Sequence, residues 1–271
     1  MGNALFIVWR ESVEAILVIG ILYAWLQANC YRHGIRWLWG GVAAGVGLAA
    51  LLGFTMLAVQ SQLAGDALEW FQIGMVFIAA ALITQMVLWM RKHGKNLKGE
   101  LEAEMGRAMN RSSLFGVAAV AALAVGREGA ETVIFLYGLG IERSGSELAL
   151  FAAAGLAGLL LALATGWALV RGGRRISWKT FFRVTETILL LLAASLLVGG
   201  TEKLIALGSL PAGIDPLWDS SFLLDDSGGA GGFLAQLTGY RARPALTTLL
   251  VLAAYWLLAL AALNRPARPQ A

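Results

Sequence analysis

The sequence predicts an all-α integral membrane protein with seven transmembrane helices, arranged as a 3+3 inverted repeat plus one extra C-terminal helix, with the N-terminus outside. Three observations predict this fold class. Hydrophobic residues make up 58% of the 271 residues and charged residues only 14%, whereas soluble domains contain about 25% charged residues. Several long apolar stretches follow one another, and one charged motif occurs twice. The composition excludes a soluble enzyme, and a single cysteine excludes a disulfide-stapled secreted domain.

A bilayer core about 30 Å thick requires roughly 20 mostly apolar residues in each helix that crosses it. We do not expect the first stretch to be a signal peptide, because Arg10, Glu11 and Glu14 interrupt its apolar residues. Seven stretches meet the length requirement, at about residues 4–28, 37–59, 69–91, 113–139, 147–170, 181–207 and 244–263.

Two of the connections between these stretches have a distinctive sequence pattern or composition. Within residues 92–112, apolar residues recur every four positions at Leu97, Leu101, Met105 and Met109, which predicts a short amphipathic helix on the membrane surface. Residues 208–243 form a long, Gly-rich and acidic segment. Connections of that length are often functional.

The distribution of Lys and Arg predicts the orientation of the chain in the membrane. Fifteen of them lie in the connections on one side and four in the connections on the other. Cytoplasmic connections are enriched in Lys and Arg, so the N-terminus is predicted outside and the C-terminus inside. The net charge of +4 is explained by this bias, and no phosphate-binding loop or basic run predicts a nucleic-acid partner.

The motif R-E-x-x-E occurs in the first and fourth stretches, as Arg10-Glu11-Ser12-Val13-Glu14 and Arg127-Glu128-Gly129-Ala130-Glu131. Each ionisable group at mid-membrane costs about 2.5–3.5 kcal/mol on insertion scales. Residues three and four apart share a helix face. Each motif is therefore predicted to present two carboxylates together, with an arginine that reaches the second one.

The two motifs also match in depth. With a rise of 1.5 Å per residue, both carboxylate pairs are expected about 12–17 Å below the outer surface. The recurrence divides the single membrane domain 1–271 into repeat one, about 1–91, and repeat two, about 113–207, with the seventh helix at about 244–263 left over. Three helices per repeat give the halves opposite orientations, and transporters of this kind bind substrate at the midplane between repeats.

Carboxylate oxygens favour hard cations. Four glutamates and two arginines give this region a formal charge of −2, which attracts a multivalent cation. The predicted metal ligands are Glu11, Glu14, Glu128 and Glu131, and Arg10 and Arg127 are predicted to pair with them.

On these motifs, their placement and the predicted topology, the chain resembles the oxidase-dependent iron permeases, the family of the yeast high-affinity iron permease and of bacterial EfeU-like and FtrC-like iron permeases. The resemblance extends to Trp89-Met90-Arg91-Lys92 and to Gly239-Tyr240. It implies import of ferric or ferrous ion across the bacterial cytoplasmic membrane. It also implies a periplasmic or extracellular partner that oxidises or delivers iron, with Asp219, Asp225 and Asp226 as a possible outer capture site.

Other functions remain compatible with the sequence. Arg10 and Arg127 could bind a small anion in a proton-coupled transporter, the site could take another divalent metal, or the charges could be fixed ion pairs in a scaffold that transports nothing. We expect no enzymatic activity, because the sequence contains no nucleophile–base pair and no ATP motif. No prosthetic group is expected; iron would be the substrate, and the surrounding partner would be membrane lipid.

Overall fold

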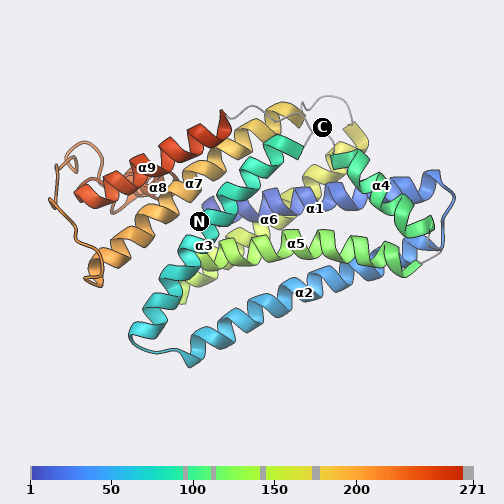
Figure 1. Ribbon diagram of the computed structural model, residues 1–271, viewed down its shortest axis with the longest axis horizontal. Coiled ribbons are helices and arrows are strands. Elements are labelled where there is room, and N and C mark those ends of the chain that lie inside the picture. Colours follow the sequence, from blue (N-terminus) through green and yellow to red (C-terminus); the bar gives the residue numbers. More distant parts are fainter. Residues whose placement is uncertain (1, 94–96, 111–113, 141–144, 173–177, 265–271) are drawn as a thin grey trace. The chain divides into compact units, whose positions relative to one another are not determined.

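The computed structural model describes residues 2–93, 97–110, 114–140, 145–172 and 178–264 (Figure 1). Every regular element within those ranges is an α-helix, which confirms the predicted all-α fold. The helices are α1 (Gly2–Ala28), α2 (Gly34–Gln62), α3 (Asp66–His93), α4 (Leu97–Asn110), α5 (Leu114–Gly140), α6 (Gly145–Gly172), α7 (Trp178–Ala206), α8 (Gly229–Thr238) and α9 (Leu246–Leu263).

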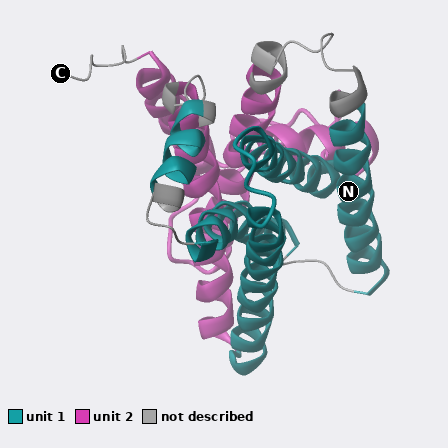
Figure 2. Ribbon diagram, turned by 90° about the vertical axis from the view of Figure 1, so that its right-hand side faces the viewer, with its two compact units in different colours: residues 1–64, 93–176 teal, residues 65–92, 177–271 magenta. Residues whose placement is uncertain are grey.

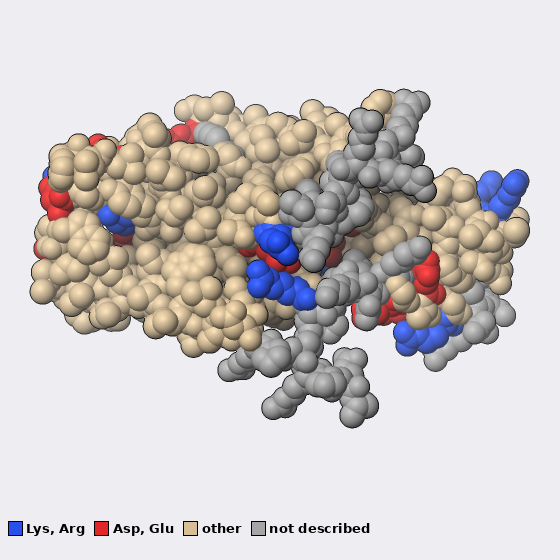
Figure 3. Space-filling model, turned by 90° about the horizontal axis from the view of Figure 1, so that it is seen from above, with Lys and Arg blue, Asp and Glu red and all other residues tan. Residues whose placement is uncertain are grey.

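Five of the described helices are long and apolar enough to cross a membrane, so the chain is a multi-pass membrane protein. The surface in Figure 3 is largely uncharged, as lipid-facing helices require. The other two predicted spans coincide with α1 and α5, whose apolar residues are interrupted by the charged motifs. The count of seven spans therefore stays a prediction. The five apolar spans are Gly34–Gln62, Asp66–Arg91, Gly145–Ala168, Arg183–Ala206 and Leu246–Leu263.

The chain divides into two compact units (Figure 2). Unit 1 comprises residues 1–64 and 93–176 and contains α1, α2, α4, α5 and α6. Unit 2 comprises residues 65–92 and 177–271 and contains α3, α7, α8 and α9. Each unit therefore combines helices from both halves of the sequence, and both R-E-x-x-E motifs lie in unit 1.

In unit 1, α2 packs closely along α5 because small residues line the contact. A Cβ atom added at Gly45 would lie 2.8 Å from the backbone nitrogen of Gly126 and 2.9 Å from the carbonyl oxygen of Ala122. One at Gly41 would overlap the carbonyl oxygen of Ala118. Only glycine allows two helix backbones to approach this closely.

The packing of α6 against α1 repeats this contact. A Cβ atom added at Gly158 would overlap the carbonyl oxygen of Leu5 and lie 3.1 Å from the backbone nitrogen of Trp9. When the arginines of the two motifs are aligned, Leu5 and Trp9 correspond to Ala122 and Gly126. The α1–α6 contact is thus the counterpart of the α5–α2 contact.

A second pair of glycine contacts also corresponds when the arginines of the two motifs are aligned. Gly53 of α2 faces Val133 of α5, and Gly166 of α6 faces Ile16 of α1. Gly41, Gly45, Gly158 and Gly166 therefore all lie at close helix contacts.

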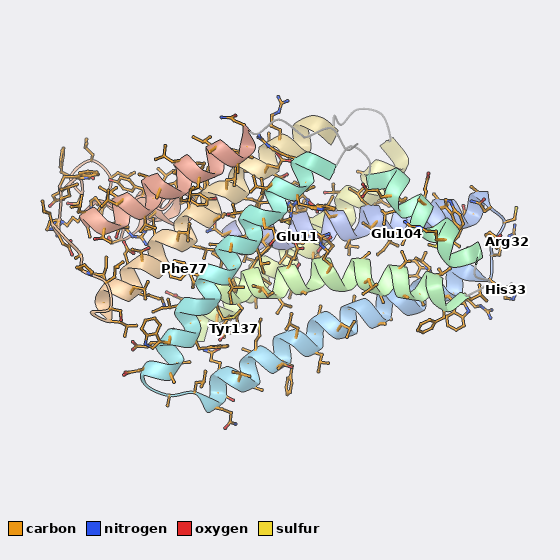
Figure 4. The ribbon with its side chains drawn as sticks, in the orientation of Figure 1. Glu11, Arg32, His33, Phe77, Glu104 and Tyr137 are labelled. Carbon is orange, nitrogen blue, oxygen red and sulfur yellow. The ribbon has the colours of Figure 1, made fainter. Side chains whose placement is uncertain are left out.

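Helix α4 confirms the amphipathic helix predicted within residues 92–112. The prediction that its apolar face contacts the membrane surface was wrong. Leu101 and Met105 are buried against other helices of unit 1 rather than turned to the membrane surface. Glu104, on the same helix, is exposed (Figure 4). The side chains of Leu97 and Met109 lie outside the described residues. The buried cluster comprises Val18, Leu22, Leu26, Leu38, Leu101, Met105, Val117 and Ala121.

In unit 2, α7 contacts α3, α8 and α9. Gly200 of α7 lies against the ring of Phe77 of α3. The hydroxyl of Tyr255 of α9 lies 3.3 Å from the hydroxyl of Thr84 of α3. The same hydroxyl of Tyr255 donates to the carbonyl of Leu190 of α7 at 3.2 Å. These contacts join α3, α7 and α9 without any residue of the R-E-x-x-E motifs.

Candidate metal site

The two motifs meet where α1 packs against α5. Glu11 contributes one carboxylate from α1, and Glu128 and Glu131 contribute two from α5. One oxygen from each lies within 4.8 Å of the other two. Oxygens on opposite sides of one bound cation are about 4–5 Å apart, so these three carboxylates are spaced for a single shared ion. Figure 4 labels Glu11 where α1 passes α5.

Arg10 pairs with both carboxylates of its own motif. Its Nη1 donates to Glu11 Oε1 at 2.7 Å, and its Nη2 lies 2.5 Å from Glu14 Oε1. The side chain of Arg10 is 1% exposed, so no water can replace these two partners. Arg10 therefore fixes Glu11 and Glu14 relative to each other inside the protein. The predicted contact between Arg10 and Glu14 is present.

Arg127 is the matching residue of the second motif, but its environment differs. Its Nε donates to Glu131 Oε1 at 2.9 Å, one turn along α5, as the spacing predicted. Its side chain is 46% exposed, against 15% for Glu131. The two arginines of the repeated motif are therefore not equivalent in this structure.

Three carboxylate oxygens at the site have unused hydrogen-bonding capacity. Oε2 of Glu11, Glu128 and Glu131 is buried, and no described residue donates to any of the three. Buried polar atoms are rarely left in this state, because an unsatisfied group loses its interaction with water without replacement. A cation bound among the carboxylates would satisfy them.

Glu14 completes the predicted set without belonging to the group of three. It is held by Arg10, and its charge acts on Glu128 and Glu131 across the helix contact. From the sequence, all four glutamates were predicted to be ligands of one site. The structure brings three of them within 4.8 Å of one another and leaves the fourth beside them.

Apolar residues occur on both sides of the carboxylates along α1 and α5. Ile7, one turn before Glu11, and Phe135, one turn after Glu131, are fully buried. Val18 and Ala121, on the other side of the carboxylates along α1 and α5, belong to the buried cluster of unit 1. Charges interact strongly where water is excluded, so a cation at this site would meet a strong field.

Residues 208–243, named the outer segment after its predicted location, contain the three aspartates predicted as a possible capture site. Asp219 accepts hydrogen bonds from the backbone and hydroxyl of Ser221 at 3.0 and 2.6 Å and from Arg243 at 3.0 Å. These bonds, the serine's foremost, lower the pKa of Asp219. Hydrogen bonds from Ser227 likewise lower the pKa of Asp225. Both stay ionised, but neither they nor Asp226 belong to the group of convergent carboxylates found among the described residues.

Several polar contacts could not be predicted from the sequence. Glu186 of α7 pairs with Arg91 of α3 at 3.0 Å and not with Arg183, three residues away on its own helix. Arg183 is exposed while Glu186 is buried, so spacing along one helix did not identify the partner.

Two further contacts link distant residues. Glu202 accepts two hydrogen bonds from Arg241, at 2.6 and 2.8 Å, which joins the outer segment to α7. The indole of Trp9, next to Arg10, donates to Thr165 of α6 at 3.1 Å. The single polar residue Thr165 in an apolar stretch was the available signal for that contact.

The chain is similar to known proteins over nearly its whole length. A family model described as the iron permease FTR1 family matches residues 1–265. The chain is 30% identical over 264 residues to a protein named ferrous iron permease EfeU from Shigella sonnei, covering 97% of this chain and 95% of that protein. It is 27% identical over 267 residues to a protein of the same name from Yersinia pestis, covering 98% and 94%. No solved structure matches the chain.

Proposed function

The chain belongs to the iron permease FTR1 family, and we propose that it imports iron across the bacterial cytoplasmic membrane through a site formed by the two R-E-x-x-E motifs. Glu11, Glu128 and Glu131 would bind the ion, and Glu14 would add negative charge beside it. Arg10 and Arg127 would position the carboxylates and balance them while the site is empty.

The observation that supports this proposal is the convergence of three carboxylates with unpartnered oxygens. Like charges repel, so three carboxylates with one oxygen each within 4.8 Å of the other two favour a cation shared among them. An anion transporter would instead need guanidinium groups available to substrate. Arg10 and Arg127 both donate to glutamates of their own motifs, which disfavours that alternative.

The inverted repeat is part of the same proposal. It is supported by the matching contacts of Gly45 with α5 and Gly158 with α1, and by the recurrence of the motif in α1 and α5. In inverted-repeat transporters, movement of one repeat against the other exposes a central site alternately to the two faces. We propose this alternation for the carboxylate site.

The names of the similar proteins favour ferrous ion as the form transported. We further propose that a periplasmic protein delivers or oxidises iron at the outer face, as the family resemblance implies. The charge of Asp219 and Asp225, which stays negative because their pKa values are lowered, would attract cations to that face.

Iron uptake by cells that depend on this protein tests the proposal. Glu11→Gln, Glu128→Gln and Glu131→Gln each keep the side-chain shape and remove a charge, so each is expected to abolish uptake. Glu147→Gln is the matched control, because Glu147 is an exposed residue in the first turn of α6. Uptake by the three site variants equal to that of the control would refute the role of the site.

A further inference from the structure

The two arginines of the repeated motif differ in a way that the repetition does not explain. Arg10 contacts two carboxylates and is 1% exposed, whereas Arg127 is 46% exposed and its Nε contacts Glu131. The residue before the arginine also differs, being Trp9 in one motif and Gly126 in the other. A role shared by both arginines would not require this asymmetry.

We propose that Arg127 is a displaceable counter-ion that leaves Glu131 when the transported cation binds, whereas Arg10 stays in place throughout. This inference rests on the proposed function, and it assigns the two arginines of the motif different roles.

The geometry supports displacement of Arg127 in particular. Glu131 is one of the three convergent carboxylates, so a cation at the site competes with Arg127 for the same side chain. A guanidinium next to a bound metal ion is repelled by it. Nearly half of the Arg127 side chain is exposed, so packed neighbours restrict it less than they restrict Arg10. Once the transport path admits water to this ion pair, the pair is weak enough for an arriving cation to replace it.

Arg10 lacks this freedom. Its movement would leave Glu11 and Glu14 buried without their shared partner, and breaking a buried pair from one side is strongly unfavourable. With Arg10 in place and Arg127 displaced, the four glutamates and one arginine have a formal charge of −3, compared with −2 while both arginines are paired. The site therefore becomes more negative as the ion arrives, and the return of Arg127 would help to release it.

Chemical footprinting of the purified full-length protein tests the displacement directly. Phenylglyoxal modifies accessible guanidinium groups, and mass spectrometry reads the modification of each arginine. Without metal, Arg127 should react and Arg10 should not. Addition of Fe²⁺ without oxygen should accelerate modification of Arg127 by up to about fivefold, the limit set by the strength of a part-exposed ion pair. Protection of Arg127 by metal, an unchanged rate, or exposure of Arg10 would overturn the proposal.

Binding measurements separate this proposal from the proposed function. Titration calorimetry with Fe²⁺ first tests the metal site itself. The site is refuted if the wild-type protein does not bind Fe²⁺, or if the Glu11→Gln variant binds it equally well. If binding is present, Arg127→Gln should lower the dissociation constant by up to about fivefold, because the competing charge is gone. Arg127→Lys, which retains that charge, should bind like the wild type. Weaker or unchanged Fe²⁺ binding by the Arg127→Gln variant would refute the displacement of Arg127 but not the metal site.

Discussion

At the scale of single residues, the geometry of the candidate site depends on pairing among buried charges. Arg10 compensates two glutamates at once, and a planar guanidinium is suited to this because its donors form a rigid fork. A lysine has one compact charged group and cannot reproduce both contacts in the same geometry. The buried pair therefore supports the shape of the site, while the unpartnered oxygens of Glu11, Glu128 and Glu131 are available to a cation.

Substitution of Arg10 tests its structural role. Arg10→Gln leaves Glu11 and Glu14 without their shared cation, and removal of one partner from a buried pair costs about 3–5 kcal/mol. The variant should unfold at a lower temperature in detergent, as measured by circular dichroism. Arg127→Gln is the control, because its exposed side chain should change the unfolding temperature much less. Equal destabilisation by the two substitutions would contradict the difference assigned to them.

The hydroxyl of Ser221 should control the ionisation of Asp219. Since folding lowers the pKa of Asp219, the contribution of this carboxylate to stability is present above its ordinary pKa and is lost as the pH falls below that value. Ser221→Ala removes the shorter of the two hydrogen bonds that Ser221 donates. The pKa of Asp219 should then rise toward its ordinary value, measured by carboxyl-carbon NMR with labelled aspartate. Asp225, whose partner is Ser227, is the internal control.

At the scale of helices, glycine positions determine which elements pair. The α2–α5 and α1–α6 contacts bring a helix of one half of the sequence against a helix of the other, and both contain the motif helix as one partner. The rigid support of the carboxylates thus comes from contacts between backbones. Helix α4 adds a buried cluster at one end of α1 and α5, where Met105 is fully buried.

A pair of substitutions in α2 tests the backbone contact. Gly45→Ala places a methyl group against the backbone of α5 and should destabilise the protein by about 1–3 kcal/mol through overpacking. Gly47→Ala, two residues along the same helix, meets no atom within 4 Å and should leave stability unchanged or slightly higher. Thermal unfolding in detergent compares the two. A Gly45→Ala variant as stable as Gly47→Ala would contradict the close packing.

Met105 tests whether the apolar face of α4 belongs to the protein core. Met105→Ala should lower the free energy of unfolding by about 2–5 kcal/mol, as expected for a large-to-small change at a buried position. Glu104→Ala, an exposed neighbour, should have little effect. If Met105 faced lipid instead, the two substitutions would differ little in denaturant unfolding.

At the scale of the whole molecule, much of the architecture could be predicted from the sequence, because apolar length and helical spacing are local properties. The spacing of Arg10 and Glu14, and of Arg127 and Glu131, was sufficient to predict both ion pairs. The unequal exposure of the two arginines could not be predicted, since it depends on neighbours far along the chain. The partner of Glu186 and the burial of the α4 apolar face were inaccessible for the same reason.

The orientation predicted from Lys and Arg can be tested with the protein's own cysteine. Cys30 is the single cysteine of the chain and is exposed in the connection between α1 and α2. If the N-terminus is outside, this connection is cytoplasmic, because α1 must cross the membrane before it. A membrane-impermeant maleimide should then label Cys30 in inverted vesicles and leave it unlabelled in intact spheroplasts. In a Cys30→Ser background, Ser227→Cys in the outer segment should give the opposite pattern. In the seven-span arrangement an odd number of membrane crossings separates the two positions, so they must lie on opposite sides. Labelling of both from the same side would contradict this arrangement, on which alternating exposure of the carboxylate site depends.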